Sequence, residues 1–360
     1  MQRRAFVAGS GIAGILAAGT APAIVQAQST LRWRLASSFP KSLDALYGTS
    51  DVFARKVADM TGGKFQISVH AAGELVPPFG VVDAVQNATV EMAHTAPYYF
   101  FGKDDTFAIG CAIPFGLNSR QMTAWMVEGN GMKLMRAFYA QYNIVNLPGG
   151  NTGAQMGGWY RKPIKSLADV KGMKIRISGF AGKIIERMGG VPQSLPGGEI
   201  YQALEKGAID AAEWTSPYDD QKLGLQRVAP FYHYPGWWEG GPQLDFYINA
   251  KAWESLTPEY RAILESAAAS SHIYMQARYD AYNPAALRQL VASGTKLVGM
   301  PKDVMDAAFH HTMDVCNELS AKNPEWKKVY SDYSAFRKEQ NTWFRFCEAG
   351  FDHYMQSAAL

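Results

Sequence analysis

Two charged residues lie where the sequence predicts buried strands. Glu213 follows the strand-like stretch 208–212, at the point where that strand should end. Arg176 lies in the alternating stretch 173–178, on the face opposite its three apolar residues. A planar guanidinium clamps a carboxylate through two parallel hydrogen bonds, which an ammonium cannot do in the same geometry. These residues therefore indicate a site that binds an acid, unless Arg176 only pairs with an acid of the protein itself and Glu213 is simply solvated.

The elements that must position these residues alternate along the chain. In the first half, hydrophobic periodicity predicts helices at 42–60 and 81–87 and strands at 31–36, 65–69 and 90–95. In the second half it predicts a short helix after Ser166, a strand at 173–177, a helix at 182–188, and a helix and strand within 201–214. Alternation of strands with helices predicts an α/β fold with mainly parallel sheets.

The two halves share one helix–turn–strand unit. Residues 201–214 match residues 83–95 at a constant offset, with apolar residues on apolar ones. Unless this short match is accidental, the chain forms two related lobes in which His94 and Glu213 occupy equivalent strand ends. Ligands of open α/β sheets bind beyond the carboxyl ends of the strands. Glu213 is therefore expected to face a cleft between the lobes.

The first 27 residues read as an export signal. A charged start precedes a short run of small apolar residues, and Val25-Gln-Ala27 is a small-x-small cleavage site. Arg3-Arg4 marks the twin-arginine export route of bacteria, unless an ordinary secretory signal carries two arginines by chance. Glycine and proline interrupt the apolar run, which disfavours a membrane anchor. The mature chain is therefore expected in the periplasm.

Composition excludes several classes of protein. Loss of the signal, which carries two arginines and no acid, lowers the formal net charge from +3 to +1, and no basic run remains that would bind nucleic acid. The cysteines Cys111, Cys316 and Cys347 are far apart and odd in number, so we expect buried thiols and no disulfide framework. A mature chain of about 330 residues suffices for a large core and two lobes.

Four stretches carry a family resemblance, namely 33–37 (WRLAS), 171–176 (KGMKIR), 204–210 (LEKGAID) and 235–241 (PGWWEGG). Together with the export signal, they resemble the solute-binding proteins of TRAP transporters (DctP family) over nearly the whole mature chain. The resemblance implies a two-lobed periplasmic receptor that hands a small organic acid to a membrane permease. Residues 149–159, 178–183 and 236–241 are most similar to the pyruvate-type receptors, which bind 2-oxo acids.

The resemblance assigns the ligand carboxylate to Arg176, but the chain departs from the wider family at one position. Members commonly carry a second arginine ahead of a Lys-Pro-Ile loop, and Gln155 stands at that position here. A neutral amide removes one positive charge, while Glu213 and, by the same resemblance, Glu239 add two negative ones. Two carboxylates alone would repel an acid by several kcal/mol in a partly desolvated cleft. A bound cation resolves this conflict.

The implied ligands of that cation are all oxygen atoms. They are the carboxylates of Glu213 and Glu239, the Trp214 carbonyl, the Gln155 amide and oxygens of the acid itself. Such a set suits a hard ion, Na⁺ or Ca²⁺, and not zinc. A 2-oxo or 2-hydroxy acid would chelate the ion through a carboxylate oxygen and the adjacent oxygen. Without the resemblance, both glutamates read as ordinary loop residues.

Aromatic residues are dense near the same loops. Tyr98 and Tyr99 are candidates for a hydrogen bond to the substrate, and Phe180 is a candidate for a wall of the cleft that excludes water. Most of the neighbouring aromatic residues are expected in the core. Asn151, in a glycine-rich loop, is a further candidate. The predicted substrate-binding set is therefore Gln155, Arg176, Tyr98, Tyr99, Asn151 and Phe180.

Enzymatic interpretations find little support. A Ser-x-x-Lys pattern at 293–296 lacks its partner motifs, and the histidine pair at 310–311 lacks metal-ligand spacing. The best enzymatic alternative is an exported hydrolase that uses Glu213 and Glu239 as acid and base. Turnover of a glycoside or ester would favour it, whereas stoichiometric binding without product favours a receptor.

The C-terminal segment 324–360 predicts one long helix. Pro324 stands at its start, and only Gly350 interrupts the good helix formers that follow. Its aromatic residues are too many for a single exposed helix, so the segment must pack on another surface. Two arrangements stay open: packing across the lobes of its own chain, or exchange of terminal helices in a homodimer, which the pyruvate-type relatives imply.

The combined prediction is a two-lobed α/β periplasmic-binding-protein fold with a ligand cleft. Lobe 1 takes residues 28–150 and about 241–283, lobe 2 takes 151–240 and about 284–323, and the C-terminal helix follows. We expect a non-enzymatic receptor that binds a 2-oxo monocarboxylate such as pyruvate with a cation and delivers it to the permease. Lactate or another organic acid is the alternative, and 2-oxobutyrate is not separated from pyruvate, since one methylene in an apolar pocket changes binding by only about 1–3 kcal/mol.

Overall fold

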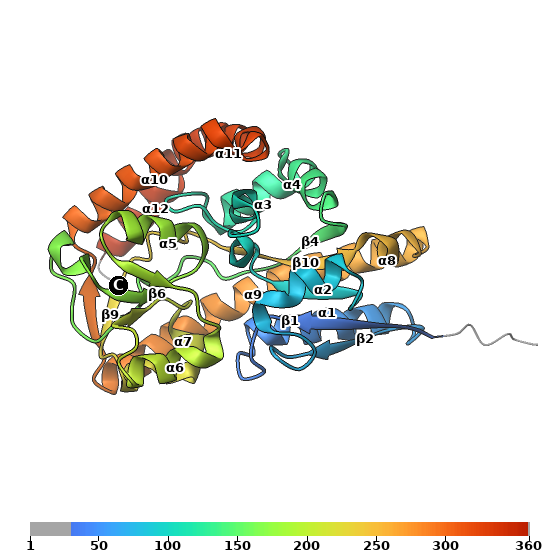
Figure 1. The fold of residues 1–360 in the computed structure, drawn as a ribbon, viewed down its shortest axis with the longest axis horizontal. Helices are drawn as coiled ribbons and strands as arrows, with labels where there is room; N and C mark the ends of the chain where they lie inside the picture. Colours follow the sequence, from blue (N-terminus) through green and yellow to red (C-terminus); the bar gives the residue numbers. More distant parts are fainter. Residues whose placement is uncertain (1–29, 359–360) are drawn as a thin grey trace, which may run out of the picture.

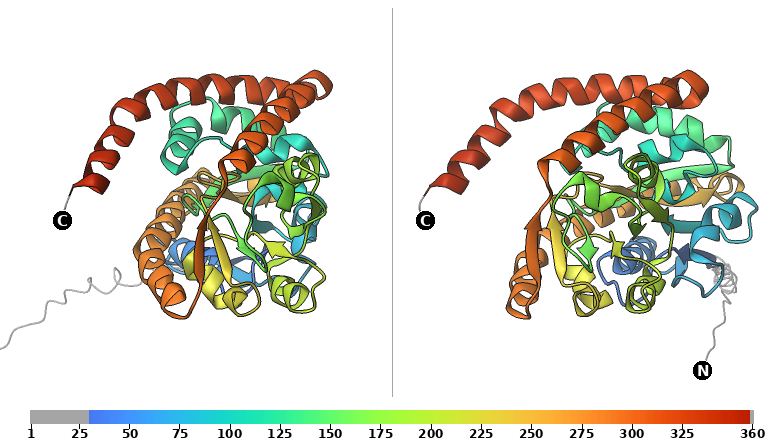
Figure 2. Two further views of the ribbon diagram at one scale, coloured as in Figure 1. Left: turned by 90° about the vertical axis from the view of Figure 1, so that its left-hand side faces the viewer. Right: turned by 60° about the vertical axis from the view of Figure 1, so that its left-hand side comes forward.

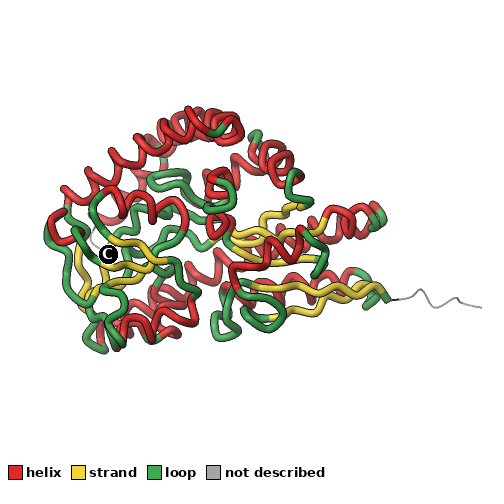
Figure 3. Tube along the Cα trace, viewed as in Figure 1, coloured by secondary structure: helices red, strands yellow, loops and turns green. Residues whose placement is uncertain are grey.

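The computed structural model describes residues 30–358, so the predicted export signal lies outside the described residues. The strands form two separate sheets (Figures 1 and 3). The first sheet has the order β2-β1-β3-β10-β4 and the second has the order β11-β9-β5-β8-β6-β7. We call the parts of the molecule built on these two sheets lobe 1 and lobe 2.

The two sheets share one pairing pattern. Lobe 1 contains β1 (Leu31–Ser37), β2 (Phe65–His70), β3 (Met92–Thr95), β4 (Ile144–Asn151) and β10 (Gln243–Asn249). Lobe 2 contains β5 (Trp159–Tyr160), β6 (Lys174–Arg176), β7 (Val191–Gln193), β8 (Ala211–Ala212), β9 (Phe231–Tyr234) and β11 (Lys296–Gly299). In lobe 1, β2, β1 and β3 are parallel and β10 runs antiparallel between β3 and β4. Lobe 2 repeats this pattern: β7, β6 and β8 are parallel, and β5 runs antiparallel between β8 and β9. The additional strand β11 pairs with β9 at the edge of the sheet.

Helices cover the sheets and connect the strands. Those within the lobes are α1 (Leu46–Met60), α2 (Val81–Gln86), α3 (Ser119–Val127), α4 (Gly131–Ala140), α5 (Gly179–Arg187), α6 (Gly197–Glu205), α7 (Pro217–Leu223) and α8 (Ala250–Glu254). Helix α2 leads into β3 and α6 leads into β8, and these two strands hold the same place in the two sheets. The structure therefore contains the repeated helix–turn–strand unit that the sequence predicts.

Helix α9 (Pro258–Ala292) ties the lobes together. It packs on α1 and β4 in lobe 1 and on α7 in lobe 2, and it runs from one lobe to the other in Figure 1. The Thr257 side chain caps its start, accepting a hydrogen bond from the Tyr260 amide at 3.2 Å, and Pro258 is the first helical residue.

Helices α10 (Lys302–Lys322), α11 (Pro324–Phe346) and α12 (Glu348–Ser357) end the chain. Helix α10 packs on α5 of lobe 2, and α11 packs on α3 and α4 of lobe 1. The long C-terminal helix is present, but it is not continuous, because the helix is interrupted at Cys347. Figure 2 shows the last turns curving away from both lobes.

Three other local expectations need correction. The first helix begins at Leu46 and not at residue 42, because Leu43 and Ala45 pack into the core from irregular backbone. The short helix after Ser166 is a single 3₁₀ turn, Leu167–Val170. Cys111 and Cys316 are buried as expected, whereas the Cys347 thiol is exposed. Within residues 30–358, no helix has the length and apolar character needed to cross a bilayer.

Candidate functional site

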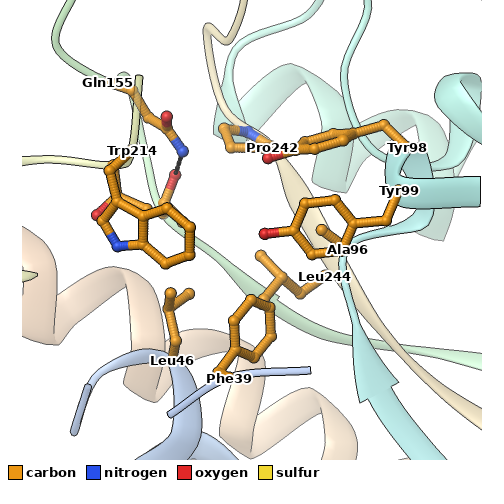
Figure 4. A pocket seen from close by; sticks show the side chains of 11 residues that line it. Phe39, Leu46, Ala96, Tyr98, Tyr99, Gln155, Trp214, Pro242 and Leu244 are labelled. Atoms are coloured by element: carbon orange, nitrogen blue, oxygen red, sulfur yellow. Dashed lines mark hydrogen bonds between the residues drawn. The ribbon is translucent and has the colours of Figure 1, made fainter. Parts of the chain in front are cut away.

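A small pocket lies where the two lobes meet (Figure 4). Its cavity volume is about 20 Å³, which is roughly the space that one water molecule needs. The lobes are therefore closed on each other. The side chains that line the pocket are Phe39, Leu46, Ala96, Tyr98, Tyr99, Thr152, Gln155, Trp214, Thr215, Pro242 and Leu244.

Beside this pocket, the carboxyl ends of β6 and β8 bring Arg176 and Glu213 together. The strands are parallel neighbours, and the Glu213 amide donates to the Arg176 carbonyl at 2.9 Å. Arg176 Nη1 donates to Glu213 Oε2 at 2.5 Å and to the Glu213 carbonyl at 3.0 Å, while Nε donates to the Leu195 carbonyl at 3.0 Å. Arg176 thus pairs with an internal acid, yet its buried Nη2 has no partner among the described residues.

Three buried oxygen atoms in this region accept no hydrogen bond from residues 30–358. They are Glu213 Oε1, Glu239 Oε2 and Gln155 Oε1. Gln155 Nε2 donates to Thr152 Oγ1 at 3.0 Å (Figure 4), which leaves the amide oxygen as the available end. Buried polar atoms without partners are rare because each costs free energy. A hard cation would satisfy all three, since carboxylate and amide oxygens are the ligands it prefers.

The same carboxylates have strongly raised pKa values. Burial raises the pKa of Glu213 to about 7, although the charge of Arg176 opposes it. Burial also raises the pKa of Glu239, and the nearby charge of Glu213 raises it further. No group of three or more histidine, cysteine or acidic side chains gathers as a metal centre in the described part of the chain. A cation here must therefore be held by these two carboxylates with neutral oxygens, and it would favour their ionised forms.

Asp220, which the sequence analysis did not assign, positions the turn that carries Glu213 and Trp214. Its Oδ1 accepts from the Thr215 amide at 3.0 Å. Its Oδ2 accepts from Trp159 Nε1 at 2.9 Å and from the Tyr232 hydroxyl at 2.8 Å. The residue is 1% exposed. The only signal in the sequence was an aspartate shortly after the Ser-Pro turn, and such aspartates usually cap helices without any part in a site.

Lobe 1 supplies hydroxyl groups and apolar walls. Tyr98 and Tyr99 lie on the 3₁₀ turn Pro97–Phe100 and face Trp214 across the pocket (Figure 4). Burial raises the pKa of both tyrosines, so both hydroxyls stay protonated and can donate. The guanidinium of Arg176 lies 4.9 Å from the centre of the Trp214 ring. The ring therefore covers the cationic end of the site.

The structure does not bring Asn151 and Phe180 to the pocket wall. Asn151 Nδ2 donates to the Gly241 carbonyl at 2.9 Å, and its Oδ1 accepts from the Gly153 amide at 2.9 Å. Both ends of the Asn151 amide thus bind backbone groups in the segments that cross from one lobe to the other. Phe180 stacks on Trp326 of α11 with ring centres 5.6 Å apart. These contacts favour packing roles for both residues over contact with a substrate.

The chain is similar to proteins of one family along nearly its whole length. Residues 36–323 match the family model DctP, described as bacterial extracellular solute-binding protein, family 7. A Nostoc protein named monocarboxylate 2-oxoacid-binding periplasmic protein is 48% identical over 328 residues, which cover 91% of this chain and 90% of that protein.

Two solved structures are also similar. A TRAP transporter solute binding protein from Bordetella bronchiseptica has a TM-score of 0.90 and 46% identity, covering 91% of this chain and 98% of that chain. It is a dimer with co-purified calcium and picolinate in one site and an apo second site. A TRAP periplasmic solute binding protein from Pseudoalteromonas atlantica, with bound sodium and pyruvate, has a TM-score of 0.88 and 34% identity, covering 92% of this chain and 100% of that chain.

The family match spans both lobes. Gln155 and Trp214, two of the cation ligands that the resemblance implies, line the pocket between the lobes, whereas Arg176, Glu213 and Glu239 are buried behind its wall. The chain therefore belongs to the DctP family, the bacterial extracellular solute-binding proteins of family 7.

Proposed function

We propose that this chain binds a small 2-oxo monocarboxylate, pyruvate or a close analogue, together with Na⁺ or Ca²⁺. As a member of its family, the chain is a solute receptor of a TRAP transporter, which is a non-enzymatic component that acts with a membrane permease. The hydrolase alternative is therefore wrong. The observation that carries the proposal is the set of three buried oxygens that find no donor within residues 30–358, beside one guanidinium nitrogen that finds no acceptor there.

Of these buried groups, the guanidinium nitrogen suits an anion, and the three oxygens suit a cation. Arg176 Nη2 is a donor and takes the carboxylate of the acid. The oxygens of Glu213, Glu239 and Gln155, with the Trp214 carbonyl, hold the cation, which neutralises the two glutamates and polarises the oxygen atoms of the acid. The hydroxyls of Tyr98 and Tyr99 complete the lobe 1 side. Because each bound ion supplies the charge that the other needs, acid and cation stabilise each other reciprocally.

The relatives' ligands favour one chemical class. Pyruvate and picolinate, found in the two solved structures, both place a donor atom next to a carboxylate, an oxo oxygen in one and a ring nitrogen in the other. Such a ligand chelates a cation through two neighbouring atoms. The Nostoc relative is named for monocarboxylate 2-oxo acids. We therefore place lactate and other 2-hydroxy acids second, as ligands with the same chelating geometry.

Native mass spectrometry and calorimetry test this proposal. Protein purified without added ligand should carry a small acid and one cation in a 1:1:1 complex. After unfolding, desalting and refolding with a chelator, pyruvate should bind weakly, and re-addition of Na⁺ or Ca²⁺ should restore its affinity. Pyruvate affinity that is indifferent to both ions and to chelator would contradict the cation site. A bound sugar or amine would indicate another class of solute.

We also propose that the exposed end of the chain forms a homodimer. The first half of α11 is buried on lobe 1, but Trp343, Phe346, Phe351 and Tyr354 are 57–77% exposed. Beside them, a trough lies between α3, α9 and the junction of α11 with α12. A second copy of this chain fits both surfaces, and the Bordetella bronchiseptica relative is a dimer. Phe346→Ser/Phe351→Ser should convert the dimer to monomer in light scattering, whereas a wild-type monomer would exclude this assembly.

Export by the twin-arginine route is a further proposal, supported by Arg3-Arg4 ahead of the apolar run. Arg3→Lys/Arg4→Lys should leave the precursor in the cytoplasm, as detected by fractionation. Export of this variant at the wild-type level would indicate the general secretory route. The residue boundaries of the lobes are proposed near 151, 241 and 284, for the three connections by which the chain passes from one sheet to the other.

A further inference from the structure

A second cluster of charges lies outside the pocket, where lobe 1 meets α7. Asp44, in the loop between β1 and α1, forms ion pairs with Lys222 of α7 and Arg278 of α9. It also accepts a hydrogen bond from the Tyr218 hydroxyl at 2.9 Å. One carboxylate of lobe 1 thus receives two donors from α7 of lobe 2 and one from α9, the helix that packs on both lobes.

The three donors are held in place without Asp44. Lys222 Nζ donates to Asp219 Oδ1 at 2.9 Å, and Arg278 Nη2 donates to the Tyr218 hydroxyl at 3.1 Å. Asp219 is fully buried, and its other oxygen accepts from the Tyr279 hydroxyl at 2.6 Å. We call Tyr218, Lys222 and Arg278 the carboxylate cradle. Because contacts between and within α7 and α9 hold these side chains, the cradle is ready to accept a carboxylate from the β1–α1 loop of lobe 1.

The carboxylate cradle favours the ionised form of Asp44. Burial alone would raise the pKa of this carboxyl, but hydrogen bonds from Lys222, Arg278 and Tyr218 outweigh burial and lower the pKa to about 2. The Asp44 side chain is still 44% exposed, so salt in the solvent partly screens these pairs.

The contact lies next to the pocket in both lobes. Leu46, two residues after Asp44, and Thr215, three residues before Tyr218, both line the pocket. Movement of lobe 1 away from α7 would separate Asp44 from the cradle and open the pocket on the same side. We propose that Asp44 is a positioning residue for ligand binding: without touching the ligand, its carboxylate docks in the cradle and holds the two lobes closed over the pocket.

This inference rests on the proposed function for its binding readout, but its conformational readout needs no ligand. The test compares Asp44→Asn with Asp83→Asn. Asp83 pairs with Lys103 at 2.7 Å within lobe 1, so the control removes the same charge from an ion pair that does not cross the cleft. Calorimetry and stopped-flow tryptophan fluorescence follow pyruvate binding at saturating Ca²⁺. Pulsed electron paramagnetic resonance follows the distance between spin labels at Gln66 and Glu205, exposed residues of lobes 1 and 2.

The labelled chains carry Cys347→Ser, because Cys347 is the exposed thiol, and are diluted with unlabelled protein so that distances within one chain are measured. We expect Asp44→Asn to raise the Kd for pyruvate about fivefold to tenfold, mainly through faster dissociation, and to shift the ligand-free distance distribution to longer distances. Asp83→Asn should change Kd less than about twofold. The Kd ratio between Asp44→Asn and wild type should shrink in 1 M KCl, where the Debye length is about 3 Å.

Asp44→Glu, which keeps the carboxylate, should recover most of the affinity. If wild-type protein binds no 2-oxo acid, the proposed ligand is wrong, and the distance distributions alone decide the role of Asp44. The inference is overturned if Asp44→Asn and Asp83→Asn give the same distance distribution, or the same Kd when pyruvate binds.

Discussion

The two lobes use one strand pattern for different chemistry. In lobe 2, the neighbouring ends of β6 and β8 carry Arg176 and Glu213, a fully buried ion pair. At the equivalent end of β3 in lobe 1, His94 is buried too, and its ring Nε2 forms a hydrogen bond with the Gly149 carbonyl at 3.1 Å. Burial lowers the pKa of His94 to about 3, so its ring is neutral. The same topology thus supports a pair of charges in one lobe and a neutral hydrogen bond in the other.

The difference has a physical reason. A buried ion pair is tolerated only when its geometry is well fixed and its remaining atoms find partners. Adjacent strand ends within one lobe provide that rigidity, whereas a surface that moves on opening and closing does not. The ends of β6 and β8 provide it for the ion pair of lobe 2, whereas lobe 1 faces the pocket with the tyrosines Tyr98 and Tyr99 and with apolar side chains. On this view, charge changes in lobe 2 should have larger effects on binding than changes in lobe 1.

The largest effect is expected at the charged end of lobe 2. Arg176→Lys keeps the positive charge but loses the fork of donors, so pyruvate affinity should fall by about 100-fold or more. Calorimetry with saturating cation measures this, and circular dichroism checks the fold. Arg187→Lys, at an exposed ion pair with Glu318 in the same lobe, is the matched control and should bind normally. Unchanged affinity for Arg176→Lys would remove this residue from the site.

Glu239→Gln tests whether Glu239 binds the cation and not the acid. Loss of one carboxylate should weaken Ca²⁺ or Na⁺ binding by about tenfold or more, and pyruvate binding with it. In a chelator, however, the variant should bind pyruvate at least as well as wild type, because repulsion of the acid is reduced. Glu128→Gln, at an exposed position of lobe 1, controls for the charge change. Equal losses of pyruvate affinity with and without cation would contradict the proposed ligand set.

The raised pKa values predict opposite pH effects with and without the cation. Without it, the folded-state pKa of Glu213, about 7, lies above the unfolded value. This group therefore stabilises the fold at low pH, and that contribution is lost as pH rises through 7. With Ca²⁺, binding displaces the proton, so cation affinity should rise by up to about tenfold per pH unit below pH 7.

Thermal unfolding between pH 5 and pH 8 measures both effects. The gain in Tm from Ca²⁺ should increase with pH, and Glu213→Gln should flatten the dependence. Burial also raises the pKa values of Asp220 and Asp245, to about 6 and about 8. In cation-free protein these two groups therefore also make the Tm fall as pH rises, so part of the pH dependence remains in the variant. A gain in Tm that is constant across this range would show that the glutamates do not exchange protons for the cation.

The smallest effect is expected in lobe 1. Tyr99→Phe removes one neutral hydroxyl and should weaken pyruvate binding by about twofold to tenfold, the range for a neutral hydrogen bond. Tyr201→Phe, in α6 of lobe 2, serves as the control. If Tyr99→Phe weakened pyruvate binding as much as Arg176→Lys does, lobe 1 would hold the acid as firmly as lobe 2. That result would contradict the difference between the lobes described above.

Local features of the site could be predicted from the sequence because they depend on near neighbours. The alternation around Arg176 and the ending of a short strand at Glu213 are set by residues within one element. The repeated helix–turn–strand unit is equally local. Family resemblance, and not spacing, supplied Gln155 and Glu239, which lie on different crossovers between the lobes.

Only the tertiary structure decided which of the distant groups meet. It leaves one side-chain oxygen each of Gln155, Glu213 and Glu239 without a donor from the described part of the chain. It also uses both ends of the Asn151 amide in a crossover and stacks Phe180 on Trp326 of α11. Asp220 and Asp44 also meet partners that no local pattern links to them, namely Trp159 and Tyr232 for Asp220, and Lys222 and Arg278 for Asp44. Hydrophobic periodicity reports which face of an element is buried but not which other element covers it, so contacts between the lobes are decided when the sheets and helices pack.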